Sequence, residues 1–169
     1  DDENGQSTTF QVVIPYNADA LPDLVCAITA ASCNIREAKS HTHVNGSVTA
    51  VNSFRVQSSI GMCDDRLKAR IRKNIEDILS IPGSRYEQEK KIREIRPRKE
   101  TAIYSIPTFV KVDQNASSRY TTVRVETRDV PGLLHKLTEA FREAGLTVDY
   151  AKITPYGGSR AVDTFLIQG

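Results

Sequence analysis

The second half of the chain combines patterns typical of strands and of a helix. Val123, Val125 and Thr127 alternate with polar neighbours, which is the period-2 signature of a strand with one buried face. The apolar residues that follow have helical spacing and share one face: Leu133, Leu134, Leu137, Ala140, Phe141 and Ala144. Segments 146–154 and 160–168 predict a hairpin around residues 156–159. The expected order is therefore strand, helix, strand, turn, strand.

The first half repeats this order, with a strand at 9–15, a hairpin at 45–46 and, between them, a helix that carries Leu21, Leu24, Val25, Ile28 and Ala31. A displacement of 113 residues places Ala38 on Ala151, and one of 111 places segment 50–54 on segment 161–165. The two-residue difference falls at the hairpin turns, where insertions cost little. We interpret the chain as two copies of one module.

The first copy continues further than the second. Apolar residues at helical spacing predict a second helix over 64–80, with Asp64 or Asp65 as its N-cap. A strand at 108–113 would complete the order β-α-β-β-α-β of a ferredoxin-like unit. The predicted fold is thus α+β, with two ferredoxin-like modules at 8–113 and 120–169 whose antiparallel sheets carry helices on one face. The second module lacks a second helix and a last strand, so we expect either that the natural chain continues or that its end is disordered.

A basic segment separates the second helix from this closing strand. Segment 84–100 holds seven cations and four anions, whereas the whole chain has a net charge of only +2. It is interpreted as a solvated excursion containing a short helix. A docking surface for an acidic protein is an alternative. Nucleic acid is disfavoured, because no stacking aromatic residues alternate with the cations.

Composition narrows the class of protein. The 169 residues are 39% hydrophobic and 26% charged, and no apolar run approaches the ~18 residues of a membrane helix, so we expect a soluble globular protein without a membrane partner. The three cysteines, Cys26, Cys33 and Cys63, have neither disulfide-framework nor zinc-site spacing. Reduced thiols favour an intracellular compartment, either cytoplasm or plastid stroma. The N-terminus has neither an initiator Met nor an apolar signal core, which indicates a processed or excised chain.

The segment 129–134 reads Asp-Val-Pro-Gly-Leu-Leu and joins the predicted strand to its helix. It resembles the Asp-x-Pro-Gly-Leu-Leu loop of ACT domains, which are small amino-acid-sensing regulatory modules. The preceding segment, 107–121, is similar to the one that joins the two C-terminal ACT domains of bacterial uridylyltransferase/uridylyl-removing enzymes, and plant and algal ACT-repeat proteins share it. The resemblance is strong over 107–168 and weaker over 8–80. The catalytic domains of that enzyme are absent from this sequence.

The physical chemistry of the loop agrees with the use that the family makes of it. Asp129 can accept backbone hydrogen bonds, Pro131 fixes φ, and Gly132 allows a ligand to approach the backbone. The free amides of the first helical turn suit an α-carboxylate. The resemblance implies an amino-acid site where two modules meet, one offering this loop and the other a strand. The ligand-binding candidates are Asp129, Val130, Pro131, Gly132, Leu133 and Leu134. Simple N-capping of the helix by Asp129 is the alternative interpretation.

The first copy departs from this motif. Asn17, Ala18 and Asp19 stand where Val130, Pro131 and Gly132 stand in the second, and without a glycine a close backbone approach is in doubt. These three residues remain candidates for ligand binding. The first site is either empty or supplies only a wall for the second.

Other possible sites are set aside. His41 and His43 face the same side of a predicted strand, but no third metal ligand has a recognisable spacing, so exposed strand residues are the preferred interpretation. His135 is expected to face solvent. Neither Cys26 nor Cys33 is flanked by a base that would activate it. No phosphate-binding loop or nucleophile motif is present, and neither a metal nor a cofactor is predicted.

The preferred hypothesis is a non-enzymatic regulatory protein that binds a small amino acid, glutamine above all, between ACT modules and reports nitrogen status to a partner enzyme or catalytic domain. Exposed edge strands favour a homo-oligomer, through the sheets or the helices. The second hypothesis is a protein–protein scaffold that has kept the fold and lost the ligand. An RNA-binding module is a weak third, since the strand motif used for base stacking is missing.

Overall fold

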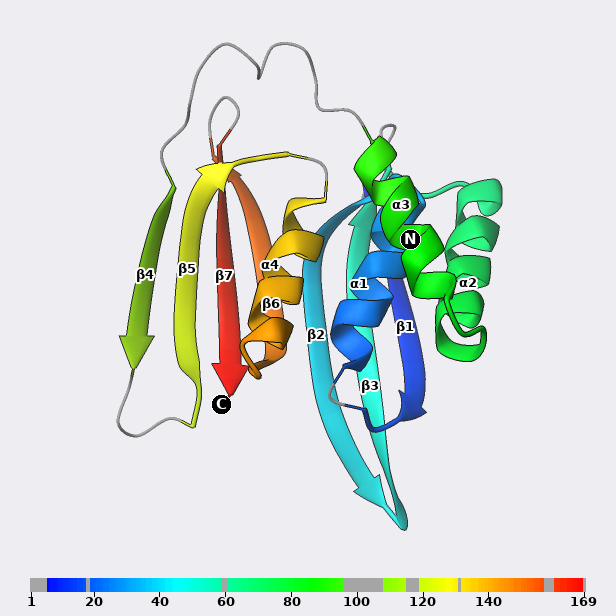
Figure 1. Ribbon diagram of the computed structural model, residues 1–169, viewed down its shortest axis with the longest axis horizontal. Helices are drawn as coiled ribbons and strands as arrows, with labels where there is room; N and C mark the ends of the chain where they lie inside the picture. The colour runs from blue at the N-terminus through cyan, green and yellow to red at the C-terminus, as the bar shows by residue number, and fades with distance from the viewer. Residues whose placement is uncertain are drawn as a thin grey trace.

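The computed structural model describes residues 6–17, 19–58, 61–95, 108–114, 119–130, 132–156 and 160–168. Within these ranges the chain forms seven strands and four helices (Figure 1). In chain order they are β1 (Thr8–Pro15), α1 (Ala20–Ala30), β2 (Asn34–Asn45), β3 (Ser47–Gln57), α2 (Asp65–Ser80), α3 (Ser84–Glu94), β4 (Phe109–Gln114), β5 (Thr121–Arg128), α4 (Leu133–Glu143), β6 (Thr147–Tyr156) and β7 (Arg160–Gln168).

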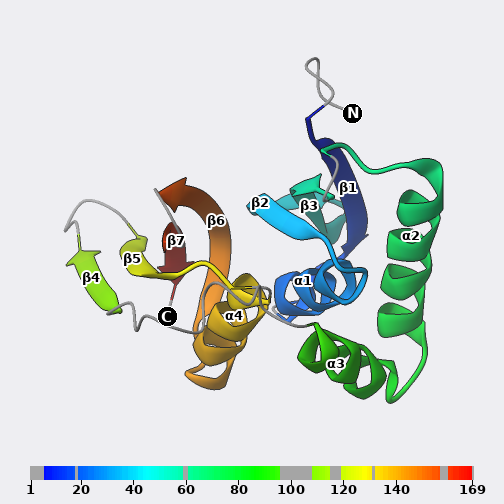
Figure 2. The same cartoon turned by 90° about the horizontal axis from the view of Figure 1, so that it is seen from above.

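All seven strands belong to one antiparallel sheet with the order β1-β3-β2-β6-β7-β5-β4. The helices lie together on one face of the sheet (Figure 2). This arrangement confirms the predicted α+β class and is compatible with two ferredoxin-like modules. The two halves of the sheet are joined where β2 pairs with β6, so the repeated units abut edge to edge. The module boundaries at 8–113 and 120–169 remain a prediction.

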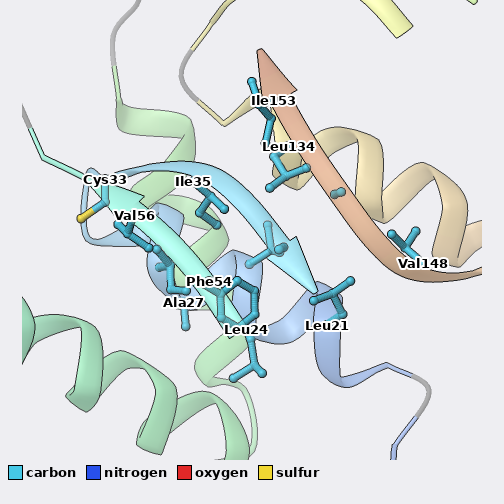
Figure 3. Packing of buried hydrophobic residues seen from close by; sticks show 14 of the residues in the cluster. Leu21, Leu24, Ala27, Cys33, Ile35, Phe54, Val56, Leu134, Val148 and Ile153 are labelled. Carbon is cyan, nitrogen blue, oxygen red and sulfur yellow. The ribbon is translucent and has the colours of Figure 1, made fainter. Parts of the chain in front are cut away.

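One core runs through both halves. Phe54 of β3 and Phe165 of β7 occupy equivalent positions in the repeat, and both are fully buried on the helix side of the sheet. Figure 3 shows residues of α1, β2 and β3 packed near Leu134 of α4 and Ile153 of β6. Every residue of α1 except Asp23 is buried. Helix α1 is buried on all sides because it contacts α2, α3 and α4 as well as the sheet. A helix in such a position is expected to be apolar all round.

The strand predicted at 108–113 forms, but it does not close the first module. It is β4, which pairs with β5 in the register Phe109↔Glu126 and Val110↔Val125. It lies at the opposite edge of the sheet from β1 (Figure 1). The prediction of its partner was wrong because alternation identifies a strand but not the strand that it pairs with. Val110 and Val112 of β4 are 62% and 58% exposed.

The region between β3 and β4 follows the prediction more closely. Asp64 is the N-cap of α2, and its side chain accepts a hydrogen bond of 2.8 Å from the Leu67 N–H. The helix ends at Ser80 as predicted. The basic segment contains the expected short helix, α3, but this helix is not merely solvated. It packs against α1 and buries Gln88 and Ile92, while residues 96–100 lie outside the described ranges.

Candidate functional site

The loop between β5 and α4 determines where α4 begins. The helix starts at Leu133, and its N-cap is Gly132 in the left-handed region with φ +79°. The Gly132 carbonyl accepts from the Lys136 N–H at 3.0 Å, and no side chain of the described residues caps the helix. Asp129 therefore does not act as the N-cap, and simple capping does not account for it. Pro131 lies outside the described residues.

Gly132 is in close contact with the first module. A Cβ atom at this position would lie 3.0 Å from Ile92 Cγ2 of α3 and 4.0 Å from Thr29 Cγ2 of α1. The missing side chain and the positive φ both favour glycine here. The sequence suggested that this glycine admits a ligand to the backbone. In the structure the group that approaches it is the side chain of Ile92.

The loop forms one side of a small cavity at the module junction. The second module contributes Asp129, Val130, Gly132, Leu133, Leu134, Ile153 and Asp163. The first contributes Thr29, Cys33, Asn34, Ile35 and Arg36 from the end of α1 and the start of β2. The cavity volume is about 30 Å³, enough for one or two groups of the size of water. The predicted loop thus meets a strand of the other module.

The cavity brings together three charged side chains. Asp163 is fully buried in β7, and neither of its carboxylate oxygens has a hydrogen-bond partner among the described residues. Burial raises the pKa of Asp163 to about 7, and the nearby charge of Asp129 adds to the rise while Arg36 opposes it. Burial also raises the pKa of Asp129, again against the effect of Arg36. The Arg36 Nε donates to Gln57 Oε1 at 2.8 Å. The base of the cavity is therefore polar, and burial favours the neutral form of its carboxyl groups.

The loop of the first module lies elsewhere. Asn17 and Asp19 are exposed, and the Asp19 N–H donates to Asn17 Oδ1 at 2.9 Å. The start of α1 and the start of α4 lie at opposite ends of the helix layer, because the two helices run in opposite directions (Figure 1). One alternative was that the first loop supplies a wall for the second site, but its described residues Asn17 and Asp19 do not line the cavity. Ala18 lies outside the described residues.

The sequence did not identify four of the polar residues at the junction: Thr29, Asn34, Arg36 and Asp163. One of them, Asp163, could have been found from the sequence pattern. Ala161, Asp163 and Phe165 alternate with outward residues in β7, so a carboxylate occupies a core position of a strand. The other three could not be found in this way, because they join the site only through the β2–β6 pairing.

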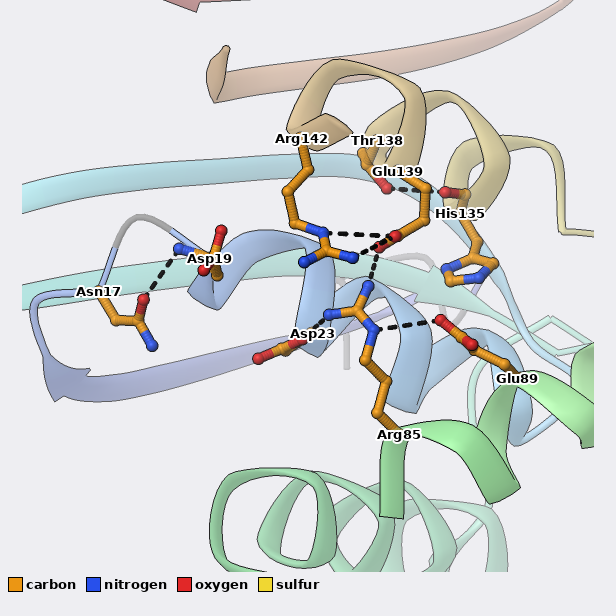
Figure 4. Close-up of polar contacts among 9 residues, drawn as sticks. All are labelled: Asn17, Asp19, Asp23, Arg85, Glu89, His135, Thr138, Glu139 and Arg142. Carbon is orange, nitrogen blue, oxygen red and sulfur yellow. Dashed lines mark hydrogen bonds and ion pairs between the residues drawn. The ribbon is translucent and has the colours of Figure 1, made fainter. Parts of the chain in front are cut away.

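A second polar cluster joins α3 to α1 of the first module and to α4 of the second (Figure 4). The Arg85 guanidinium forms ion pairs with Asp23 of α1 and Glu139 of α4, and with Glu89 of its own helix at 3.1 Å. Arg142 adds a contact of 2.8 Å to Glu139. Because the side chains of Arg85, Asp23 and Glu139 are mostly buried, removing one partner should cost more than breaking a surface ion pair.

His135 lies in the cleft between α3 and α4, which has a volume of about 680 Å³. The prediction that it faces solvent was wrong, since only 8% of the residue is exposed. Its Nδ1 has no hydrogen-bond partner among the described residues, and burial lowers its pKa. The apolar period of α4 did not reveal this, because it carries no information about α3, a distant segment that lines the same cleft.

The structure also shows the surroundings of the histidines and cysteines that the sequence analysis rejected as metal ligands or nucleophiles. His41 and His43 are exposed on β2, as expected. The described residues contain no group of three or more side chains that could hold a metal ion. Cys26 and Cys33 are buried, and burial raises the pKa of each to about 12. Thiols of this kind are poor nucleophiles at neutral pH.

Comparison with known proteins shows that the chain is similar in sequence to part of a bacterial enzyme. The "Bifunctional uridylyltransferase/uridylyl-removing enzyme" of Azospirillum brasilense is 34% identical over 154 residues, covering 86% of this chain and 15% of the relative. The same enzyme of Erythrobacter litoralis is 33% identical over 98% of this chain and 18% of its own length. That of Novosphingobium aromaticivorans is 37% identical over 83% of this chain and 15% of its own. This chain is homologous to part of that enzyme.

The homology covers most of this chain but less than a fifth of each relative. No family model matches the sequence. Among solved structures, a protein described as "Crystal Structure of an Unknown Protein from Galdieria sulphuraria" has a TM-score of 0.32 and 16% identity, covering 96% of this chain and 80% of that one. None of the helices in the described ranges combines the length and the apolarity needed to cross a membrane.

Proposed function

We propose that this chain is a non-catalytic regulatory protein made of two ACT modules, and that it binds a small amino acid, glutamine above all, at the module junction. The observation that carries the proposal is the cavity where Asp129, Val130 and Gly132 meet the start of β2. Support comes also from the homology to an enzyme of which this chain matches only a small part. The ligand would inform a partner enzyme, or a catalytic domain, of nitrogen or amino-acid status.

The charges around the cavity complement a free amino acid. An amino acid carries an ammonium and a carboxylate on one carbon, so its receptor needs opposite charges close together. Asp129 and Asp163 provide carboxyl groups that an incoming ammonium group would favour in their ionised form, and Arg36 provides the positive charge. The first amides of α4, which no side chain caps within the described ranges, add a partial positive charge beside the loop.

The junction is closed in this structure, and its cavity is far smaller than glutamine. Binding therefore requires Ile92 to leave Gly132, or the modules to separate along β2 and β6. A ligand that binds only the open arrangement shifts the equilibrium toward it by its difference in affinity for the two states. This coupling turns an amino-acid concentration into a change of module orientation.

The proposal includes an assembly and a compartment. The edge strands β1 and β4 suit strand addition between copies of the chain, and hence a homo-oligomer. The reduced, buried cysteines fit the cytoplasm or the plastid stroma.

A thermal-melting screen against the twenty amino acids at millimolar concentration tests the proposal. A ligand present at 100 times its dissociation constant stabilises the folded state by ~2.7 kcal/mol, which is an easily measured shift. We expect a shift with one amino acid that is lost in Asp129→Asn and kept in Asp113→Asn. The control removes a carboxylate from the exposed strand β4. Absence of a shift with all twenty would overturn the proposal.

A scaffold without a ligand is the second candidate. The observation that favours it is the Ile92 side chain, which fills the space beside Gly132. A scaffold would show no shift in the screen but would still form an oligomer or bind a partner protein. Sedimentation velocity of the same samples detects self-association independently of any ligand.

A further inference from the structure

The core contains a carboxylate, Asp163, whose burial the contacts described so far do not explain. It lies in the middle of β7 between inward-facing Ala161 and Phe165, and it is 0% exposed. A buried carboxylate without hydrogen bonds is costly, because burial removes its hydration without replacing it. Both Asp163 oxygens are in this situation within the described part of the chain. Such a group calls for a partner that the folded chain does not itself provide.

The equivalent residue of the first module differs in charge only. A displacement of 111 residues places Asn52 of β3 on Asp163. Asn52 is also 0% exposed, and its amide oxygen and nitrogen have no partner among the described residues. A polar side chain at this position is thus a property of the module, whereas a negative charge is a property of the second module alone.

The surroundings of Asp163 suit a cation. The residue lines the junction cavity, with Asp129 and Arg36 on its other walls. The cavity has room for one or two water-sized groups, and a primary ammonium is of this size. Arg36 opposes the rise in the pKa of Asp163 but does not abolish it, so the carboxyl remains partly protonated near pH 7. An incoming ammonium would favour the ionised form.

We infer that Asp163 is the base of a subsite that receives the α-ammonium group of the amino-acid ligand, with Asp129 at its mouth and Arg36 beside the ligand's carboxylate. The inference rests on the proposed function and deepens it. Because Asn52 carries no charge, the first module has no matching subsite. The chain therefore binds one ligand rather than two.

Isothermal titration calorimetry of the full chain tests this subsite with two probes. The first is L-glutamine, and the second is glutaramic acid, which is glutamine without its α-ammonium. If the melting screen selects another amino acid, that compound and its own desamino analogue take their places. The variants are Asp163→Asn, which copies the residue of the first module, and Asp113→Asn as the exposed control.

We expect wild-type protein to bind glutamine with a stoichiometry of one and to bind glutaramic acid at least ~20-fold more weakly. Asp163→Asn should lose at least ~20-fold in affinity for glutamine and change less than ~3-fold for glutaramic acid, because a hydrogen bond between charged groups is worth about 10- to 100-fold. Asp113→Asn should behave as wild type. This pattern assigns the loss to the pair of Asp163 with the ammonium.

Three outcomes would overturn the inference, and they are distinguishable. Unchanged glutamine binding by Asp163→Asn removes the subsite and leaves the proposed function standing. An equal loss for both probes shows that Asp163 acts only on the structure of the site. Failure of the wild-type protein to bind any amino acid removes the proposed function, and the subsite with it.

Discussion

Ala38 of β2 pairs directly with Ala151 of β6, and the two residues are equivalent in the repeat. Their neighbours pair as Glu37↔Lys152 and Lys39↔Tyr150, so the two strands meet about a local twofold axis. Ala38 is 0% and Ala151 is 1% exposed. Each module thus covers the edge strand of the other, which protects two edges from other pairings. The small side chains lie under α1 and α4, which contact one another.

Enlarging this junction should destabilise the protein. Ala151→Leu adds three carbon atoms at a fully buried position, and overpacking of this kind costs about 1–3 kcal/mol. The free energy of unfolding, measured by urea titration, should fall by that amount. Ala69→Leu, at an exposed position of α2, is the control and should change it by less than ~0.5 kcal/mol. Equal stability of both variants would mean that the junction is loosely packed.

Asp163 should make the stability of the protein depend on pH. Its pKa rises from 3.8 in the unfolded chain to about 7 in the folded one. Between these values the folded state holds a proton that the unfolded state has lost, so stability falls as the pH rises from about 4 to 7 and is level above. Asp129, whose pKa is also raised, acts in the same direction, and Arg36 opposes both.

The variant Asp163→Asn should remove most of this fall. Its free energy of unfolding at pH 8 should exceed that of the wild type by on the order of 2–4 kcal/mol, because each pKa unit corresponds to about 1.4 kcal/mol. Urea titrations at pH 4, 5, 6, 7 and 8 measure the difference. Asp113→Asn should follow the wild-type curve. Parallel curves for Asp163→Asn and the wild type would contradict the assignment.

Arg85 should be important for the position of α3. In Arg85→Met the carboxylates of Asp23 and Glu139 lose an ion-pair partner while remaining mostly buried. We expect a loss of about 1–3 kcal/mol in the free energy of unfolding and faster amide exchange in α3. Lys73→Met breaks the exposed pair with Asp77, whose atoms are 3.3 Å apart, and should cost no more than ~0.5 kcal/mol. Slow exchange in α3 of Arg85→Met would show that apolar contacts alone hold the helix.

Two glycines with the same backbone geometry allow the cost of backbone strain to be distinguished from the cost of a steric contact. Gly132 has φ +79° and Gly83 has φ +82°, and each is the N-cap of a helix. A Cβ atom at Gly83 would meet nothing within 4 Å, whereas one at Gly132 would lie 3.0 Å from Ile92 Cγ2. Alanine at either position costs about 1 kcal/mol for the left-handed backbone.

Gly132→Ala should therefore destabilise the protein more than Gly83→Ala, by about 1–2 kcal/mol measured by urea unfolding. The excess should shrink when Ile92→Ala is added, since the truncated side chain gives up the contact. An excess that survives in the double variant would locate the crowding at another residue.

Local pattern predicted most of the elements. The alternation at Val123 and Val125 identified β5, and apolar residues at helical spacing identified α2, with its cap at one of two neighbouring aspartates. These signals are local, because a strand or helix shows its buried face within a few residues. The repeat also identified which residues of the two modules are equivalent. Ala38 and Ala151, which pair with one another in the sheet, are such equivalent residues.

The sequence by itself determined the fold class, the repeat and the loop that faces the junction, because each depends on residues close together in the chain. Tertiary structure decided which strand accepts β4, where α3 packs, and which side chains surround Asp163. These depend on contacts between segments far apart, and neither periodicity nor composition carries that information. Arg36 and Asp163 are separated by more than a hundred residues and share a cavity only because β2 joins β6.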